Sequence, residues 1–154
     1  MSRPYISVQL AAQIMADAGH CCGYCRAEER LTGSRLSIEH LVPIAAGGSS
    51  ERSNLWHSCR ECNERKGAQL QVLDPLSGER VDLFNPRTQS WLAHFRWSDD
   101  GLQIVGQTAI GRATVAALDL NRAHLLVARQ RWVLVGWHPP AEDLEEGQDE
   151  QLRS

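Results

Sequence analysis

Four cysteines in two CxxC pairs constrain this chain more than any other feature of its sequence. Cys22 and Cys25 form one pair, and Cys59 and Cys62 form the other, with 33 residues between the pairs. Two such pairs supply the four thiolates that a structural zinc ion requires. The gap exceeds the roughly 15 to 20 residues of a zinc ribbon. We therefore expect a structural zinc site that encloses a substantial insert, and an N-terminal part that unfolds without zinc.

Disulfide bonds and unrelated thiols are the alternative interpretations of these cysteines. The N-terminal segment carries polar residues throughout and lacks the apolar centre of a signal peptide, and no stretch reaches 18 apolar residues. We therefore expect a cytoplasmic protein without a membrane partner, in which thiols stay reduced. Cys21 adjoins the first pair, and we assign it to packing because Cys22 makes the two pairs match.

The charge of the chain is unevenly distributed. The net charge is −3, but the segment from Glu142 to the end holds six acidic residues and one arginine, which leaves 13 acidic and 15 basic residues before it. The basic residues are nearly all arginine, which suits bidentate phosphate contacts, although the codon usage of a GC-rich genome explains the same bias. The folded part is thus close to neutral and slightly basic, so the net charge of the whole chain does not argue against a nucleic-acid partner.

The first half of the chain reads as helix, strand, loop, strand and helix. Ser7 can cap a helix over 8–18, which Gly19 would end. Residues 35–41 and 54–58 have strand character, and the loop between them would make a hairpin with a long connection. Ser58 and Glu61 have capping-box spacing, which predicts a helix that begins there.

The second half has a different character. "HFRWSDDGLQIVGQT" places apolar and aromatic residues on both sides of a polar turn and predicts a hairpin. The following segment to residue 138 has apolar residues at helical spacing and predicts one or two helices, with a break near Asn121. We expect a core in this half from its aromatic residues, namely Trp91, Phe95, Trp97, Trp132 and Trp137.

Glu39 and His40 are adjacent titratable residues at the end of the first predicted strand. A carboxylate suits a hard cation such as Mg²⁺ or Mn²⁺, and a histidine held beside it can take a proton from water. On a regular strand the two side chains would face opposite sides, so they can serve one site only where the chain leaves strand geometry. Pro43 follows closely, which is consistent with such a departure.

The succession of CxxC, "IEHLVPIAAGG" and "NLWHSCRECNERKG" resembles the HNH endonuclease family, in the subgroup whose ββα-metal unit is braced by a four-cysteine zinc. The resemblance extends from Cys22 to about Gly67. The later part of the chain is similar to the C-terminal extension of a bacterial HNH subgroup. The fold expected is α+β: a zinc-braced ββα-metal unit with an N-terminal helix (1–75), a hairpin-plus-helix extension packed on it (76–138), and a disordered acidic tail (139–154).

The resemblance implies a role for each matching residue. His40 corresponds to the general base that activates water, and Glu39 to the acidic metal ligand before it, a position that is commonly Asp. Asn54 corresponds to the residue that holds the loop and orients the base, and Asn63 to the position that completes the catalytic metal site. Metal-site, catalytic and zinc residues would thus be Glu39, His40, Asn54, Asn63, Cys22, Cys25, Cys59 and Cys62.

Phosphate contacts are expected from the helix that follows the second CxxC pair. Arg60, Arg65 and Lys66 lie on it, and Lys66 follows Asn63 by about one turn. Basic residues on an exposed helix face are simply solvated as often as they contact phosphate. We make no prediction of oligomeric state.

The function expected from these features is metal-dependent hydrolysis of DNA phosphodiester bonds. The cofactors would be structural Zn²⁺ and catalytic Mg²⁺ or Mn²⁺. The main alternative is a catalytically silent, zinc-stabilised nucleic-acid-binding module, which would have no reason to keep Glu39, His40 and Asn63 together. A redox or zinc-sensing protein that uses Cys21 is a third possibility, and it requires a reactive thiol.

Overall fold

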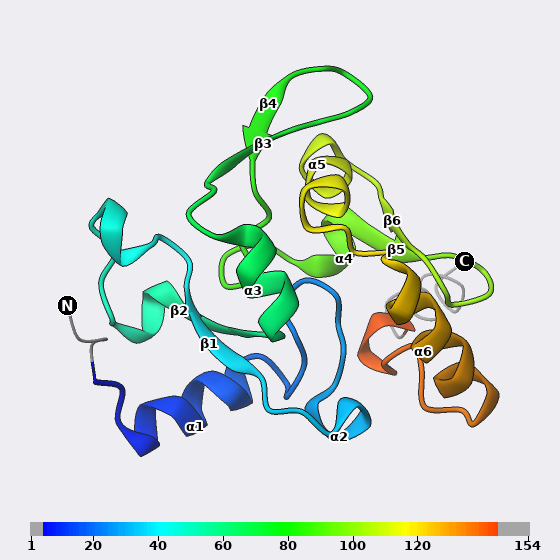
Figure 1. Cartoon of the computed structure of the whole chain (residues 1–154), viewed down its shortest axis with the longest axis horizontal. Helices are drawn as coiled ribbons and strands as arrows, with labels where there is room; N and C mark the ends of the chain where they lie inside the picture. Colours follow the sequence, from blue (N-terminus) through cyan, green and yellow to red (C-terminus); the bar gives the residue numbers. More distant parts are fainter. Residues whose placement is uncertain (1–4, 145–154) are drawn as a thin grey trace, which may run out of the picture.

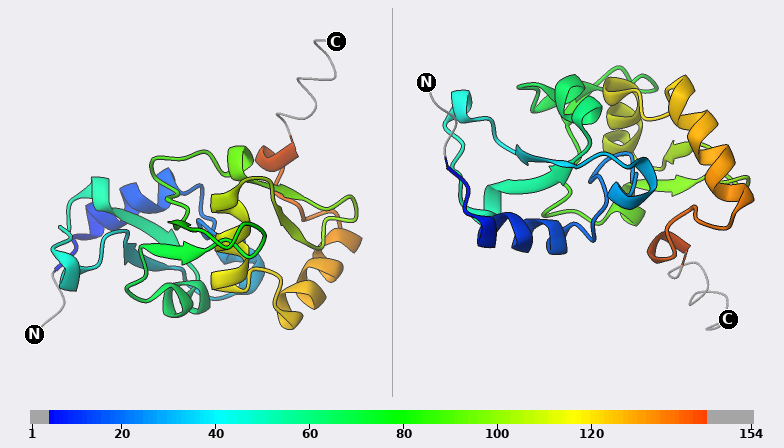
Figure 2. Two further views of the ribbon diagram at one scale, coloured as in Figure 1. Left: turned by 90° about the horizontal axis from the view of Figure 1, so that it is seen from above. Right: turned by 60° about the horizontal axis from the view of Figure 1, so that its bottom comes forward.

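A computed structural model describes residues 5–144 of the chain. Its first helix, α1 (Val8–Asp17), begins after Ser7, whose Oγ accepts a hydrogen bond of 3.1 Å from the Leu10 amide. This is the predicted cap, and the helix agrees with the sequence prediction to within one residue. α1 lies beside β2 in both views of Figure 2. A short helix, α2 (Glu29–Thr32), follows the first CxxC pair.

The predicted hairpin is present. β1 (Ser37–His40) pairs with β2 (Leu55–Ser58) in antiparallel register, so that Glu39 lies opposite Trp56 and His40 opposite Leu55. Two short 3₁₀ turns, η1 (Ile44–Ala46) and η2 (Arg52–Asn54), occupy the long connection. Helix α3 (Arg60–Lys66) follows β2 and contacts β1, which completes a ββα unit.

The start of α3 differs from the prediction. Cys59, not Ser58, is the N-cap, and its Sγ accepts a hydrogen bond of 3.4 Å from the Cys62 amide. Ser58 is instead the last residue of β2 and is fully buried. The thiol of the CxxC turn therefore takes the place that a serine hydroxyl has in an ordinary capping box.

The described residues of the second half form hairpins and helices that pack on the ββα unit. β3 (Gln71–Leu73) and β4 (Arg80–Asp82) form a hairpin that the sequence analysis missed, and α4 (Trp91–His94) leads into the second hairpin. That second hairpin, β5 (Phe95–Trp97) with β6 (Ile104–Gly106), confirms the prediction. α5 (Ala109–Leu118) and α6 (Ala123–Leu134) are two helices with the break near Asn121, whose side-chain amide bonds the backbone N and O of Ile104. In Figure 1 α3 lies between the β1–β2 hairpin and this half.

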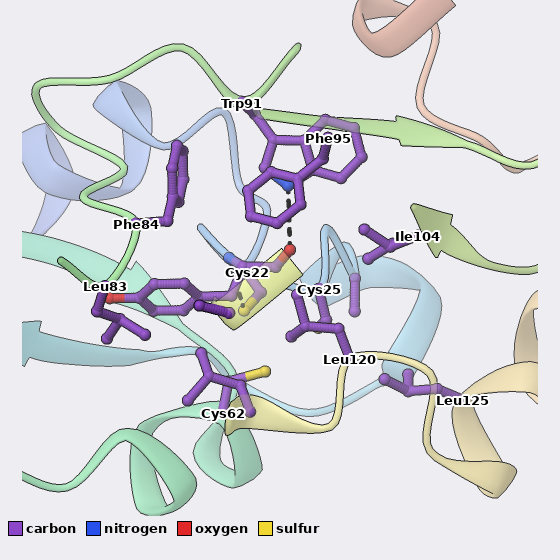
Figure 3. Packing of buried hydrophobic residues seen from close by; sticks show 14 of the residues in the cluster. Cys22, Cys25, Cys62, Leu83, Phe84, Trp91, Phe95, Ile104, Leu120 and Leu125 are labelled. Carbon is purple, nitrogen blue, oxygen red and sulfur yellow. Dashed lines mark hydrogen bonds between the residues drawn. The ribbon is translucent and has the colours of Figure 1, made fainter. Parts of the chain in front are cut away.

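One apolar core joins the two halves. Cys22, Cys25 and Cys62 belong to the same buried cluster as aromatic residues of the second half, and Figure 3 shows them together. The Trp91 indole donates a hydrogen bond of 3.1 Å to the Tyr24 carbonyl between the first two cysteines. Trp91 also stacks on Phe95, with ring centroids 5.1 Å apart. The cysteines are therefore part of the core itself.

Most of the aromatic residues expected in the core of the second half are there, but Trp137 is not. Trp91, Phe95 and Trp97 are buried and Trp132 packs against the cluster, whereas Trp137 is 60% exposed. Trp137 follows the end of α6 beside Gly136, whose φ is 78°, so the chain turns there and directs this residue away from the core.

The segment expected to be disordered from residue 139 is packed as far as residue 144. Asp143 is buried, and its carboxylate accepts hydrogen bonds from Arg26 Nη2 at 2.6 Å and from the Trp97 indole at 2.9 Å. The predicted start of the disordered tail is therefore wrong for residues 139–144, because the buried carboxylate of Asp143 accepts hydrogen bonds from Arg26 and Trp97. The remainder of the predicted tail, 145–154, lies outside the described residues.

Replacing Asp143 with alanine should destabilise the protein by about 3 kcal/mol, because it leaves a mostly buried guanidinium without its partner. Chemical denaturation followed by circular dichroism measures the loss. Its exposed neighbour Glu142 is the matched control, and Glu142→Ala should change stability by less than about 0.5 kcal/mol. Equal midpoints for the two variants would show that the packing of Asp143 contributes nothing.

Candidate functional site

The four cysteines of the two CxxC pairs meet at one point. Their sulfur atoms all lie within 4.8 Å of one another, and Cys25 Sγ is 3.7 Å from Cys59 Sγ. A tetrahedral zinc with Zn–S bonds of about 2.3 Å separates its sulfur ligands by about 3.8 Å. No disulfide joins any of the five cysteines. The donors and their spacing fit a structural zinc ion.

Backbone amides and one arginine surround the sulfurs. The Tyr24 amide donates a hydrogen bond to Cys22 Sγ at 3.5 Å, and the Cys62 amide donates one to Cys59 Sγ at 3.4 Å. Each CxxC turn thus has a backbone amide directed at its own first sulfur. Arg122, from the junction of α5 and α6, donates to Cys59 and Cys62. Arg122 is not predictable from the sequence, since no local pattern connects it with residues 60 positions earlier.

Cys21 lies apart from this cluster. It is 3% exposed, and burial raises the pKa of its thiol to about 12. A reactive cysteine needs an accessible thiolate near neutral pH. The assignment of Cys21 to packing agrees with this environment, and a thiol-based redox function has no support from it.

Glu39 points into the protein from β1. The side chain is 2% exposed, and the Tyr24 hydroxyl donates a hydrogen bond to Oε1. Oε2 is buried and has no hydrogen-bond partner among the described residues. Burial raises the pKa of the carboxyl to about 7, against the opposing effects of the Lys66 charge and of the Tyr24 and Ser58 hydroxyls; the Ser58 hydroxyl is itself buried without a well-formed hydrogen bond within residues 5–144. An unpartnered buried oxygen is costly, and a cation beside it would offset that cost.

His40 is the last residue of β1, and its ring is directed at the long loop. Nε2 lies 3.0 Å from the Ser50 hydroxyl. Partial burial and, to a lesser degree, the Lys66 charge lower the pKa of the imidazole, which is therefore neutral near pH 7. Both residues lie within the regular part of β1, so their side chains face opposite sides, Glu39 toward Tyr24 and His40 toward Ser50. The expected departure from strand geometry at this pair is therefore wrong, because the chain leaves the strand only after His40. Ser50 was not predicted; its position in "GGSS" was the available signal.

Asn54 holds the loop that follows His40. Its amide oxygen accepts from the Val42 backbone N at 2.9 Å, and its Nδ2 donates to the carbonyls of Val42 and Ser49 at 3.0 and 2.8 Å. Gly48 lies inside this loop, where an added Cβ would approach the Val42 oxygen to 1.8 Å. The loop therefore has one tight conformation that brings Ser50 back to His40.

Helix α3 carries two further predicted residues, and no hydrogen bond among the described residues joins the Asn63 side chain to Glu39 or His40. Asn63 is half-buried in the middle of the helix. Lys66 is only 3% exposed, and its Nζ donates to the His40 carbonyl at 3.3 Å. The prediction of Lys66 as a phosphate contact is therefore wrong. It lies one turn after Cys62, on the face that packs against β1, so its ammonium points inward.

Arg60 and Arg65 are exposed on α3, as phosphate contacts would have to be. Each pairs with a carboxylate on the same helix, Arg60 with Glu64 at 2.9 Å and Arg65 with Glu61 at 3.3 Å, and Arg65 also lies 3.8 Å from the carboxylate of Asp119. Such exposed pairs are weak. Both guanidinium groups can exchange these partners for a phosphate at little cost.

Residues 22–73, about a third of the chain, match the model of a family described as HNH endonuclease. The match begins at Cys22 and contains both CxxC pairs, β1, β2 and α3. It ends before most of the second half. No curated protein and no solved structure is significantly similar to the chain. Within the described residues, no helix has the length and apolar character needed to cross a membrane.

Proposed function

We propose that this chain, whose residues 22–73 match the HNH endonuclease family, is a metal-dependent endonuclease that hydrolyses DNA phosphodiester bonds. The observation that carries the proposal is the placement of His40 at the end of β1, directly after the buried carboxylate of Glu39, on a ββα unit whose cysteines meet at one point. Glu39, His40 and Asn63 come from the two elements, β1 and α3, that this unit packs together. We place the protein in the cytoplasm.

Glu39 and Asn63 are the residues that would hold the catalytic metal. A carboxylate and an amide oxygen suit Mg²⁺ or Mn²⁺, and the unpartnered Oε2 of Glu39 supplies an acceptor that fits a cation. When bound, the ion would polarise the scissile phosphate and stabilise the leaving oxygen. Glu39 is longer by one methylene than the usual Asp. The Tyr24 hydroxyl holds Oε1, so Oε2 is the oxygen available to the ion.

His40 is the proposed general base. When the Nε2–H group donates a hydrogen bond to the Ser50 hydroxyl, the Nδ1 lone pair is free to accept a proton from water. The water oxygen then attacks phosphorus in line with the leaving 3′ oxygen. Asn54 and Lys66 act as positioning residues here, because Asn54 fixes the loop that carries Ser50 and Lys66 holds the His40 carbonyl.

Arg60 and Arg65 are the proposed contacts to the DNA backbone. Their charges would offset the repulsion between the phosphodiester and the nucleophile. This requires them to leave Glu64 and Glu61, which their exposure permits. DNA affinity should therefore fall as the salt concentration rises.

A catalytically silent binding module is the second candidate, and one observation favours it. Glu39 is nearly inaccessible and bonded to Tyr24, so an ion can reach it only if the surrounding side chains adjust. A protein that uses only the zinc scaffold would bind DNA through Arg60 and Arg65 without cleaving it. The difference between the two candidates is therefore metal-dependent chemistry.

The test is cleavage of supercoiled plasmid by the zinc-loaded full chain. We expect nicked or linear product with Mg²⁺ or Mn²⁺ and none with EDTA at a concentration that leaves the structural zinc in place. Zinc content is measured in parallel, and a gel-shift assay measures DNA binding. DNA binding without cleavage in either metal would identify the silent module.

A further inference from the structure

Arg122 is a buried arginine at the junction of α5 and α6. It is 5% exposed, and its backbone N bonds the Asp119 carbonyl at 3.2 Å, so the turn between the two helices fixes its position. It belongs to the half of the chain that lies outside the family match. Its side chain nevertheless extends to the second CxxC pair.

The guanidinium of Arg122 is directed at two sulfurs. Nη2 lies 3.4 Å from Cys59 Sγ and 3.5 Å from Cys62 Sγ, and Nη1 lies 3.5 Å from Cys62 Sγ. Nη1 also donates to the carbonyls of Leu118 at 3.4 Å and Asp119 at 3.3 Å, and Nε is 3.0 Å from Glu61 Oε2 in an ion pair. In the described part of the chain, no arginine or lysine side chain donates to Cys22 or Cys25.

Glu61 holds this guanidinium by charge rather than by a hydrogen bond, because the Arg122 Nε has no hydrogen-bond partner among the residues that the structure describes. Glu61 lies between Cys59 and Cys62 in the sequence, and its Oε2 is also 2.8 Å from His124 Nε2, at the start of α6. The CxxC turn therefore supplies both the sulfurs and the carboxylate that hold one arginine. Contacts on several sides of the planar group leave it little freedom to turn away.

The charges explain why a cation is stable in this position. A zinc ion with four thiolates carries a net charge of −2, and a buried net charge is costly unless an opposite charge lies beside it. Neutral thiols would leave the buried guanidinium with only carbonyl oxygens and one half-exposed carboxylate. The guanidinium therefore places a positive charge directly beside the sulfurs of Cys59 and Cys62.

We propose that Arg122 is an outer-sphere partner of the zinc site, so that the C-terminal half completes a metal centre whose ligands all come from the N-terminal half. The guanidinium donates to the zinc-bound sulfurs of Cys59 and Cys62, draws electron density from them and makes them poorer nucleophiles. Arg122 therefore slows metal loss and protects these two cysteines from alkylation. Outer-sphere partners of this kind typically change metal affinity by 10- to 100-fold.

The test compares Arg122→Met and Arg122→Lys with wild type in the zinc-loaded full chain. Methionine keeps most of the volume and removes charge and donors, whereas lysine keeps the charge. Arg129→Lys is the control for general loss of stability, because Arg129 is fully buried in the same half and bonds only backbone and Asn121 oxygens among the described residues. All variants are assayed at a temperature where circular dichroism shows them folded.

Zinc transfer to a chromogenic chelator and alkylation of each cysteine, read by mass spectrometry, are the first readouts. We expect at least tenfold faster zinc release in Arg122→Met, with faster alkylation at Cys59 and Cys62 than at Cys22 and Cys25. Arg122→Lys should recover part of the loss. The Arg129 control should release zinc at close to the wild-type rate.

The absorption spectrum of the cobalt-substituted protein is the second readout, and it does not depend on stability. Loss of donors to the sulfurs should shift the sulfur-to-cobalt charge-transfer bands in Arg122→Met and leave them unmoved in Arg129→Lys. The proposal would be overturned if Arg122→Met kept the charge-transfer bands of wild type and released zinc faster only in proportion to its lower melting temperature. If Arg122→Met fails to fold, the same comparison applies to Arg122→Lys, and unchanged bands and release rate there would overturn it equally.

Discussion

Replacing His40 with alanine should reduce metal-dependent DNA cleavage by about 10²- to 10⁴-fold, the range that general acid–base catalysis contributes. The substitution removes the group that accepts the proton of the attacking water. It should leave the fold intact, because the ring is partly exposed and bonds a loop hydroxyl rather than the core. Initial rates of plasmid nicking at saturating Mg²⁺ or Mn²⁺ measure the effect, and zinc content and melting temperature verify the fold.

Two further variants separate the role of His40 from general effects. Ser50→Ala removes the hydroxyl that holds Nε2, so it should reduce the rate less than His40→Ala does. His20→Asn changes an exposed histidine outside the site, at a positive φ that asparagine tolerates, and should cleave like wild type. Cleavage by His40→Ala at the wild-type rate would remove His40 from the mechanism.

Removing zinc should unfold both halves of the protein together. The free energy that structural zinc contributes, about 10–16 kcal/mol in zinc-finger peptides, equals or exceeds the whole stability of an ordinary domain, about 5–15 kcal/mol. Cys22, Cys25 and Cys62 share one core with Trp91 and Phe95, so the loss cannot stay in the first half. This extends the expectation from sequence, which was that the N-terminal part unfolds without zinc.

A titration with a strong zinc chelator measures this loss. Far-ultraviolet circular dichroism reports the helices, and tryptophan fluorescence reports the core around Trp91 and Trp97. Both signals should change at the same chelator concentration and return when zinc is restored. Cys22→Ala should reproduce the metal-free state, whereas Cys21→Ala should keep zinc, because Cys21 lies outside the cluster. A fluorescence signal that stays native after zinc is lost would show that the second half folds independently.

The sequence by itself determined the features that depend on residues close together in the chain. The capped helix after Ser7, the β5–β6 hairpin and the division between α5 and α6 follow from caps, turns and periodicity. The zinc cluster also followed, because the spacing within each CxxC pair already specifies a ligand turn. The resemblance added the order of Glu39, His40, Asn54 and Asn63.

Only the tertiary structure decided how distant charged and polar groups pair. Lys66 is read from sequence as an exposed cation, since lysine is seldom buried without a partner; the partner is a carbonyl 26 positions earlier. Arg122 reaches sulfurs 60 positions away, and Asp143 binds an arginine 117 positions away. The partner of such a side chain depends on which surfaces come into contact when the two halves of the chain pack together. A local pattern of residues does not predict that contact.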